Sequence, residues 1–327
     1  MAAVTRGQRL LIIALLTIAL MAPPIVLGIS GQLGLASAFV YGGVIAIGAA
    51  FYGLRLAVAL SLVAGAAGLA ATLLNPHPLA GAVAFGLFTG GCALSARRGL
   101  HSPVLMVPIF ISFILAAPPD VVGMSATPAA IATGVALALG GLWATGSVRL
   151  LMGRPQATIE HAGLSMRVAV IYSALMGLVL GVATWFVLLD ARYHQGAWLL
   201  LTLIVVLQPS PHDTLIKSLQ RLGGTIVGGV FALVLIVIGV QSTLALVIGG
   251  VVLYVALAVR YVLKRPYWEY IAVLTPAVIL LNAPGLDALR VAEDRVAFTV
   301  IATVVGITLA LVFKAFIARK APAEDST

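Results

Sequence analysis

The sequence has few charged residues and almost no cysteine. Only 9% of its 327 residues are charged, and Cys92 is the single cysteine. One cysteine excludes an intrachain disulfide and a metal site built from several thiolates. With 62% hydrophobic residues, the chain has more apolar surface than a soluble core needs. This composition predicts a protein that crosses a membrane many times.

Signatures of enzyme chemistry are also missing from the sequence. It has no glycine-rich P-loop for ATP and no serine, histidine and aspartate pattern with elbow glycines. Its histidines occur singly in predicted loops: His77, His101, His161, His194 and His212. We therefore predict that the chain is not an enzyme and that it uses neither a cofactor nor a bound metal. We predict no nucleic-acid partner either, because in a membrane protein the net charge of +9 reflects topology.

Apolar runs near the ~20 residues that a spanning helix requires recur along the chain. Reading them between charge, proline and glycine predicts an all-α polytopic membrane protein with about twelve transmembrane helices. The expected helices run from Leu10 to Ile29, Leu33 to Tyr52, Leu54 to Leu74, Leu79 to Ala96, Pro103 to Ala117, Thr127 to Leu150, Val168 to Leu189, Ala197 to Gln208, Leu222 to Val240, Leu244 to Leu263, Tyr270 to Ala283 and Val296 to Ile317.

The basic residues predict the orientation. If the amino terminus is cytoplasmic, 16 of the 19 basic residues fall on the cytoplasmic side, as membrane proteins prefer. The other three are Arg192, Arg290 and Arg295, which this topology places on a charged outer rim. We therefore expect a multi-pass protein of the bacterial inner membrane with both termini in the cytoplasm.

The two halves of the chain match at a constant offset of 166 residues. Arg55 aligns with Arg221, Arg98 with Lys264, and Gly140 with Gly306. Six helices per half is an even number, so the halves form parallel repeats related by an axis along the membrane normal. We expect a first repeat over residues 1–150, a short cytoplasmic linker over 151–167, a second repeat over 168–318 and a disordered cytoplasmic tail over 319–327.

Prolines interrupt the expected fifth and eleventh helices at corresponding places in the two halves. The eleventh contains Thr275 directly before Pro276. Paired breaks of this kind indicate a transport site near the midplane of the membrane, although proline also kinks membrane helices for packing alone. Thr275 would hydrogen-bond either a carbonyl that the break frees or a substrate.

The expected eighth helix is only about half a membrane span long and ends at Gln208-Pro209. This length predicts that Gln208 lines a cytoplasmic vestibule. The next residues, 213–221, pair an apolar stripe with polar residues and predict a short interfacial helix, capped by Asp213 or Thr214.

Arg221 is the strongest candidate for an anion-binding residue. We expect it to open the ninth helix, with Thr225 on the same face and Gly224 and Gly228 on an adjoining small-residue stripe. A guanidinium at a helix amino terminus attracts a carboxylate. The alternative is an arginine that marks the membrane boundary beside a helix-packing stripe. Arg55 is the repeat partner of Arg221.

Two segments resemble the fusaric acid resistance (FUSC) family of aromatic acid exporters, to which malate-type anion channels of plants are distantly similar. The first runs from Trp198 through Gln208-Pro209 to the R-x-x-G-T-x-x-G pattern of Arg221, Gly224, Thr225 and Gly228. The second is YWEYIAVLTPAVILL, which begins at Tyr267. Many members carry a soluble domain where this chain has only a short linker. Related proteins work with a periplasmic adaptor, so an adaptor and a homo-oligomer are candidate partners.

Two further residues have alternative interpretations. Glu269 is a candidate proton carrier, or it pairs with Lys264 or Arg265 at the interface. Trp198 belongs to an interfacial aromatic belt, or it stacks on an aromatic ligand.

The sequence and the resemblance together predict an exporter of small organic anions, by resemblance aromatic carboxylates, driven by the proton gradient or the membrane potential. A gated anion channel of the malate-channel type and a non-transporting membrane scaffold for envelope assembly are the alternatives. The expected partners are a small organic anion and the lipid bilayer.

Overall fold

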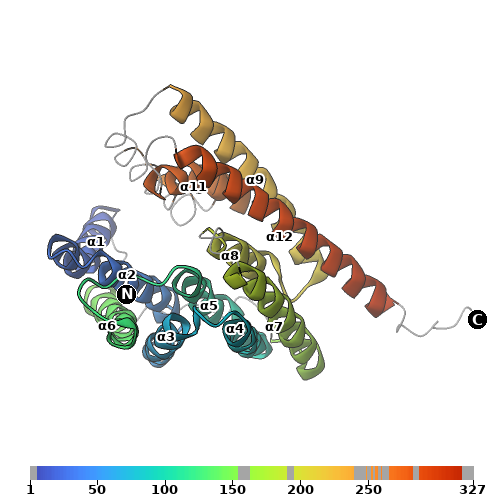
Figure 1. Ribbon diagram of the computed structural model, residues 1–327, viewed down its shortest axis with the longest axis horizontal. Coiled ribbons are helices and arrows are strands. Elements are labelled where there is room, and N and C mark those ends of the chain that lie inside the picture. Colours follow the sequence, from blue (N-terminus) through green and yellow to red (C-terminus); the bar gives the residue numbers. More distant parts are fainter. Residues whose placement is uncertain are drawn as a thin grey trace, which may run out of the picture. The chain divides into compact units, whose positions relative to one another are not determined.

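Every regular element that the computed structural model describes is a helix (Figure 1). The structure describes residues 6–153, 163–189, 195–238, 265–282 and 287–318, with single positions at 248, 252, 255, 256 and 259. The helices are α1 (Arg6–Ile29), α2 (Leu33–Ala50), α3 (Leu54–Leu74), α4 (Pro78–Ala93), the 3-10 helix η1 (Leu94–Arg98), α5 (His101–Ala116), α6 (Ala126–Met152), α7 (Met166–Leu189), α8 (Ala197–Val206), α9 (Pro211–Val237), α11 (Tyr267–Asn282) and α12 (Asp287–Ala318).

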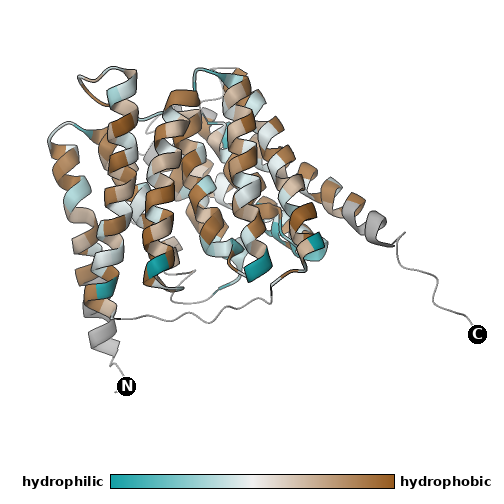
Figure 2. Cartoon of the chain, turned by 90° about the horizontal axis from the view of Figure 1, so that it is seen from below, coloured by the Kyte–Doolittle hydropathy of each residue, from teal (hydrophilic) through white to brown (hydrophobic). Residues whose placement is uncertain are grey.

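Seven of the described helices are long and apolar enough to cross a membrane by length and composition, and four shorter ones are also apolar. Apolar residues cover these helices along most of their length, and the most hydrophilic residues gather near helix ends (Figure 2). Large hydrophobic side chains such as Leu87, Leu178 and Phe231 are more than one-third exposed. Such exposure suits a hydrocarbon environment. The prediction of an all-α polytopic membrane protein is confirmed.

The number of twelve helices and the two repeats stay predictions. The expected tenth helix, Leu244 to Leu263, lies outside the described residues except for five single positions. The expected linker and tail also lie largely outside them. The chain forms two compact units, residues 1–197 and 198–327.

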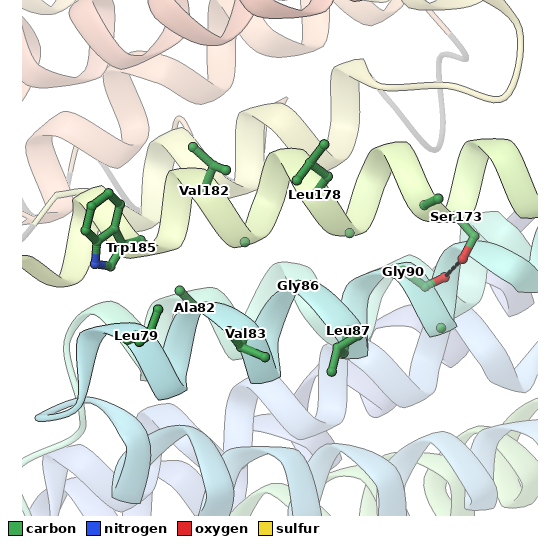
Figure 3. A pocket seen from close by; sticks show the side chains of 14 residues that line it. Leu79, Ala82, Val83, Gly86, Leu87, Gly90, Ser173, Leu178, Val182 and Trp185 are labelled. Atoms are coloured by element: carbon green, nitrogen blue, oxygen red, sulfur yellow. Dashed lines mark hydrogen bonds between the residues drawn. The ribbon is translucent and has the colours of Figure 1, made fainter.

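In the first unit, glycines bring helix backbones into close contact. On α4, a Cβ atom added to Gly86 would lie 2.6 Å from the carbonyl oxygen of Gly177 on α7. One turn further along α4, the Ser173 hydroxyl of α7 donates a hydrogen bond of 2.6 Å to the carbonyl oxygen of Gly90 (Figure 3). Because membrane helices gain little from hydrophobic association in lipid, small residues that permit close packing hold them together.

In the second unit, α9 packs against both α11 and α12. The helix is continuous from Pro211 to Val237, so the prediction of a separate interfacial helix over 213–221 is wrong. Pro211 suits the first helical position, and the Ser210 hydroxyl accepts a hydrogen bond from the Asp213 backbone N–H at 3.5 Å. Ser210 therefore caps the helix, in place of the predicted Asp213 or Thr214.

The start of α9 is amphipathic, but two of its hydroxyl residues, rather than its large apolar ones, are turned inward. Thr214 and Ser218 are buried, whereas Ile216 and Leu219 are exposed. An amphipathic segment at a water interface would show the opposite arrangement. In a membrane unit, however, the outward face meets lipid and polar groups are satisfied inside.

We predict that Gly86→Val destabilises the first unit, whereas Gly91→Val on the same helix does not. The valine side chain at Gly86 would collide with backbone atoms of α7, and overpacking of this kind typically costs about 1–3 kcal/mol. Gly91 has no atom within 4 Å of an added Cβ. Thermal unfolding of the two purified variants in the same detergent checks this, and equal unfolding temperatures would contradict it.

Candidate functional site

Arg221 lies in the middle of α9, on its buried face. Only 4% of the residue is exposed, and its Nη1 donates a hydrogen bond of 3.2 Å to the Tyr267 hydroxyl of α11. Its Nε has no hydrogen-bond partner among the described residues. The prediction that Arg221 opens a helix is wrong, because α9 begins ten residues earlier at Pro211. The helix dipole therefore adds little, and burial gives this guanidinium its importance.

Arg295 of α12 is the largest completely buried side chain in the described part of the chain, with 1% of the residue exposed. Its guanidinium carbon lies 4.2 Å from the centre of the Trp198 ring of α8, a cation–π contact. None of its three side-chain nitrogens has a hydrogen-bond partner among the described residues. The prediction of an exposed outer-rim residue is wrong for Arg295.

The error has a physical source. The sequence predicts that the last membrane helix starts at Val296, which leaves the charged run with Glu293 and Asp294 on the outer rim. Helix α12 instead starts at Asp287, which places Arg295 two turns inside it. There Arg295 shares the buried face with Ala292 and Thr299, while Glu293 is exposed. The sequence indicates the burial of Arg295 only through spacing, because Ala292, Arg295 and Thr299 stand three and four residues apart, as residues on one helix face do.

The two arginines lie on helices that pack against each other, α9 and α12. The Arg295 guanidinium also interacts electrostatically with the Arg221 guanidinium and with Tyr267 and Tyr270. Among the described residues, no carboxylate forms an ion pair with either arginine. Glu269, on α11, lies 3.9 Å from Arg265 instead, which is one of the two pairings that the sequence predicted. The site therefore holds two cations without a protein counter-ion in the described part of the chain.

Hydroxyl groups accompany the two arginines inside this unit. The Oγ1 atoms of Thr225 and Thr275 are buried without a hydrogen-bond partner among the described residues. The same holds for Thr202, Ser218 and Thr303. Burying a hydroxyl without a partner costs free energy. The described part of the first unit contains such hydroxyls too, at Thr89, Ser95, Thr133 and Thr184. The position of Thr225, one turn from the buried Arg221, is what connects its hydroxyl with this site.

Glycines let α11 approach this face of α9. A Cβ atom added to Gly224 would lie 2.6 Å from the Trp268 carbonyl oxygen, and one added to Gly228 would lie 2.7 Å from the Thr275 Cβ. Helix α11 continues through Pro276, and α5 continues through Pro108. The predicted helix breaks at these prolines are therefore wrong, and Pro276 serves packing against Gly228.

Gln208 and Pro209 form the turn between α8 and α9. The Gln208 side chain donates a hydrogen bond of 2.8 Å to the Val205 carbonyl oxygen, and its Oε1 accepts one of 3.0 Å from Lys217 Nζ. The Thr214 hydroxyl accepts the Gln208 backbone N–H at 2.9 Å. These hydrogen bonds stabilise the turn that connects α8 with α9, the helix that contains Arg221.

Arg55, the proposed repeat partner of Arg221, lies in the other unit. It is exposed at the start of α3. The matching position in the first half is therefore not a buried cation.

A hollow lies in the first unit, between α4 and α7 (Figure 3). It measures about 480 Å³, and its lining is almost entirely apolar, with Leu79, Leu87 and Trp185 along it. The Ser173 hydroxyl in its wall already donates to Gly90. Nothing in this groove would hold an anion.

One family model matches part of the chain, most of it in the second unit. Residues 179–309 match the family model described as fusaric acid resistance protein-like. The matched segment includes α8, α9, α11 and most of α12, and therefore both arginines. No curated protein and no solved structure matches the chain.

We predict that Gly224→Val destabilises the second unit, whereas Gly223→Val is nearly neutral. Gly224 faces the backbone of α11, and a larger side chain there would push apart the two helices that carry Arg221 and Tyr267. The expected cost is about 1–3 kcal/mol. Gly223 directly precedes Gly224 on the same helix and has no atom within 4 Å of an added Cβ. Thermal unfolding in detergent compares them, and a stable Gly224 variant would refute the close contact.

Proposed function

Since the chain carries a membrane domain of the FUSC family, we propose that it exports small organic anions across the bacterial inner membrane. The observation that supports this proposal is the burial of Arg221 in the family-matched unit, without an ion-pair partner among the described residues. Cationic side chains inside membrane proteins are rare and mark substrate or ion pathways.

The chemistry of the residues favours an anion. A guanidinium is always charged and presents several N–H donors in one plane, which match the geometry of a carboxylate. Leaving such a group buried and unpaired is strongly unfavourable. Tyr267 orients Arg221 through its hydroxyl, and Thr225 follows one turn later on the same buried face. A carboxylate bound here would satisfy donors that the described protein groups leave unpaired.

Membrane potential is the driving force that we favour. An interior-negative potential moves each negative charge outward with about 2.3 kcal/mol per 100 mV. Glu269 remains the candidate for proton coupling, but its contact with Arg265 and its partial exposure are typical of a surface ion pair. A uniporter that exports anions down this potential needs no buried carboxylate.

The proposal also includes two parallel repeats, the side of the termini and the partners. Helix α3 packs on α6, and α9 packs on α12; these pairs correspond at the offset of 166 residues, which supports two parallel repeats. Both termini in the cytoplasm, aromatic carboxylates as substrates, and an adaptor or a second copy of the chain as partners rest on the sequence and the family resemblance.

We predict that Arg221→Gln reduces anion flux by about 10- to 100-fold while the protein still inserts into membranes. Losing one charge-assisted interaction costs about 1.5–3 kcal/mol, which corresponds to this range. The assay is potential-driven transport of labelled benzoate, 4-hydroxybenzoate and succinate in proteoliposomes.

Arg265→Gln is the matched control for this experiment, because the Arg265 side chain is 61% exposed and lies outside the site. Flux that saturates with substrate favours an exporter, whereas unsaturated current on the same membranes favours a gated channel. Wild-type protein that is inert in both assays would favour the scaffold alternative. Wild-type flux in the Arg221→Gln variant would eliminate Arg221 as the binding group.

A further inference from the structure

A single carboxylate on Arg221 accounts for only one of the two buried cations. Arg295 is more completely buried than Arg221, and it comes from a different helix. In the low dielectric of a membrane unit, the repulsion between two guanidinium groups is much stronger than in water. A singly charged ligand would leave one of these charges uncompensated.

Arg295 is held in a way that leaves its donors available. The Trp198 ring covers one face of the guanidinium at 4.2 Å, and the N–H groups of a guanidinium lie in its plane, away from a stacked ring. Nε, Nη1 and Nη2 have no partner among the described residues. The Thr299 hydroxyl donates instead to the Arg295 backbone carbonyl oxygen, at 2.8 Å. The ring thus positions the cation without consuming its hydrogen bonds.

Arg221 is also positioned by an aromatic residue that leaves one of its donors unpaired. The Tyr267 hydroxyl accepts from Nη1, which orients the group and leaves Nε without a partner among the described residues. Each arginine therefore has one aromatic residue that positions it and at least one unsatisfied donor. The two groups come from facing helices, α9 and α12, which pack against each other.

We propose that Arg221 and Arg295 together bind one small dianion, a dicarboxylate whose two carboxylates pair with one guanidinium each. This inference rests on the proposed anion transport and deepens it, because it makes Arg295 a second binding residue and makes charge number the basis of selectivity. A dianion brings the two-arginine site to neutrality. A monocarboxylate such as benzoate would not do so.

The test compares dicarboxylates with their own monoamides, which have nearly the same size but one negative charge fewer. Succinate, glutarate and adipate are each paired with the corresponding monoamide at constant ionic strength. Binding to the full chain in detergent or nanodiscs is measured by calorimetry, and ligand-induced thermal stabilisation is measured in parallel. For at least one chain length, we expect the wild type to bind the dicarboxylate about 10- to 100-fold more tightly.

Arg295→Gln removes this preference in our proposal. The variant is expected to bind the dicarboxylate and the monoamide within about threefold of each other, and to retain monoamide binding through Arg221. Arg221→Gln weakens binding of both. Because one buried like charge is removed, the ligand-free Arg295→Gln variant should unfold at a higher temperature than the ligand-free wild type.

The outcomes separate the two proposals. Equal binding of dicarboxylate and monoamide by the wild type overturns the dianion site, and so does an Arg295→Gln variant that keeps the wild-type preference. Either result leaves the proposed anion transport intact if Arg221→Gln still loses flux. Failure of the wild type to bind or transport any carboxylate overturns both. The wild-type comparison needs no variant, so the test remains decisive even if Arg295→Gln does not fold.

Discussion

The arrangement of the second unit depends on the cost of holding a guanidinium inside a membrane protein. Such a group persists at this depth only when something compensates its charge. Arg221 has a phenol hydroxyl and Arg295 has an indole ring, and neither contact neutralises a full charge. In the proposed function, a bound anion supplies the remaining compensation.

The same constraint explains why α9 is built as it is. Its outward face carries Ile226, Val230 and Phe231, which suit lipid, while its inward face carries hydroxyls, glycines and the arginine. Glycines at 224 and 228 bring α11 close enough for Tyr267 to reach Arg221. A larger residue at either position would separate the cation from the group that orients it. The packing of α11 on α9 therefore also determines the geometry of the site.

Much of the architecture could be predicted from the sequence, because the length and apolarity of membrane helices are strong signals. The family segment and Arg221 were also recognisable from the spacing of arginine, threonine and glycine. Two kinds of information were missing. The pattern over 213–221 shows that a helix is amphipathic, but not whether its polar face meets water or the protein interior. The charges around Arg295 predicted an outer rim, whereas the start of α12 at Asp287 and the burial of Arg295 place this cation inside the unit.

The proposed repeats differ in their chemistry. At the offset of 166 residues, Thr225 corresponds to Ala59, Arg295 to Ala129 and Trp198 to Gln32. Arg221 does have a like residue in the first half, Arg55, but it is exposed. By contrast, the packing glycines Gly140 and Gly306 correspond, and both sit against a neighbouring helix. At the same offset, however, Gly224 and Gly228 correspond to Val58 and Leu62. If the halves arose by duplication, the cationic site and the glycines that bring α11 close to it were kept or built in only one copy. A protein of this kind would bind its anion with residues of the second unit alone.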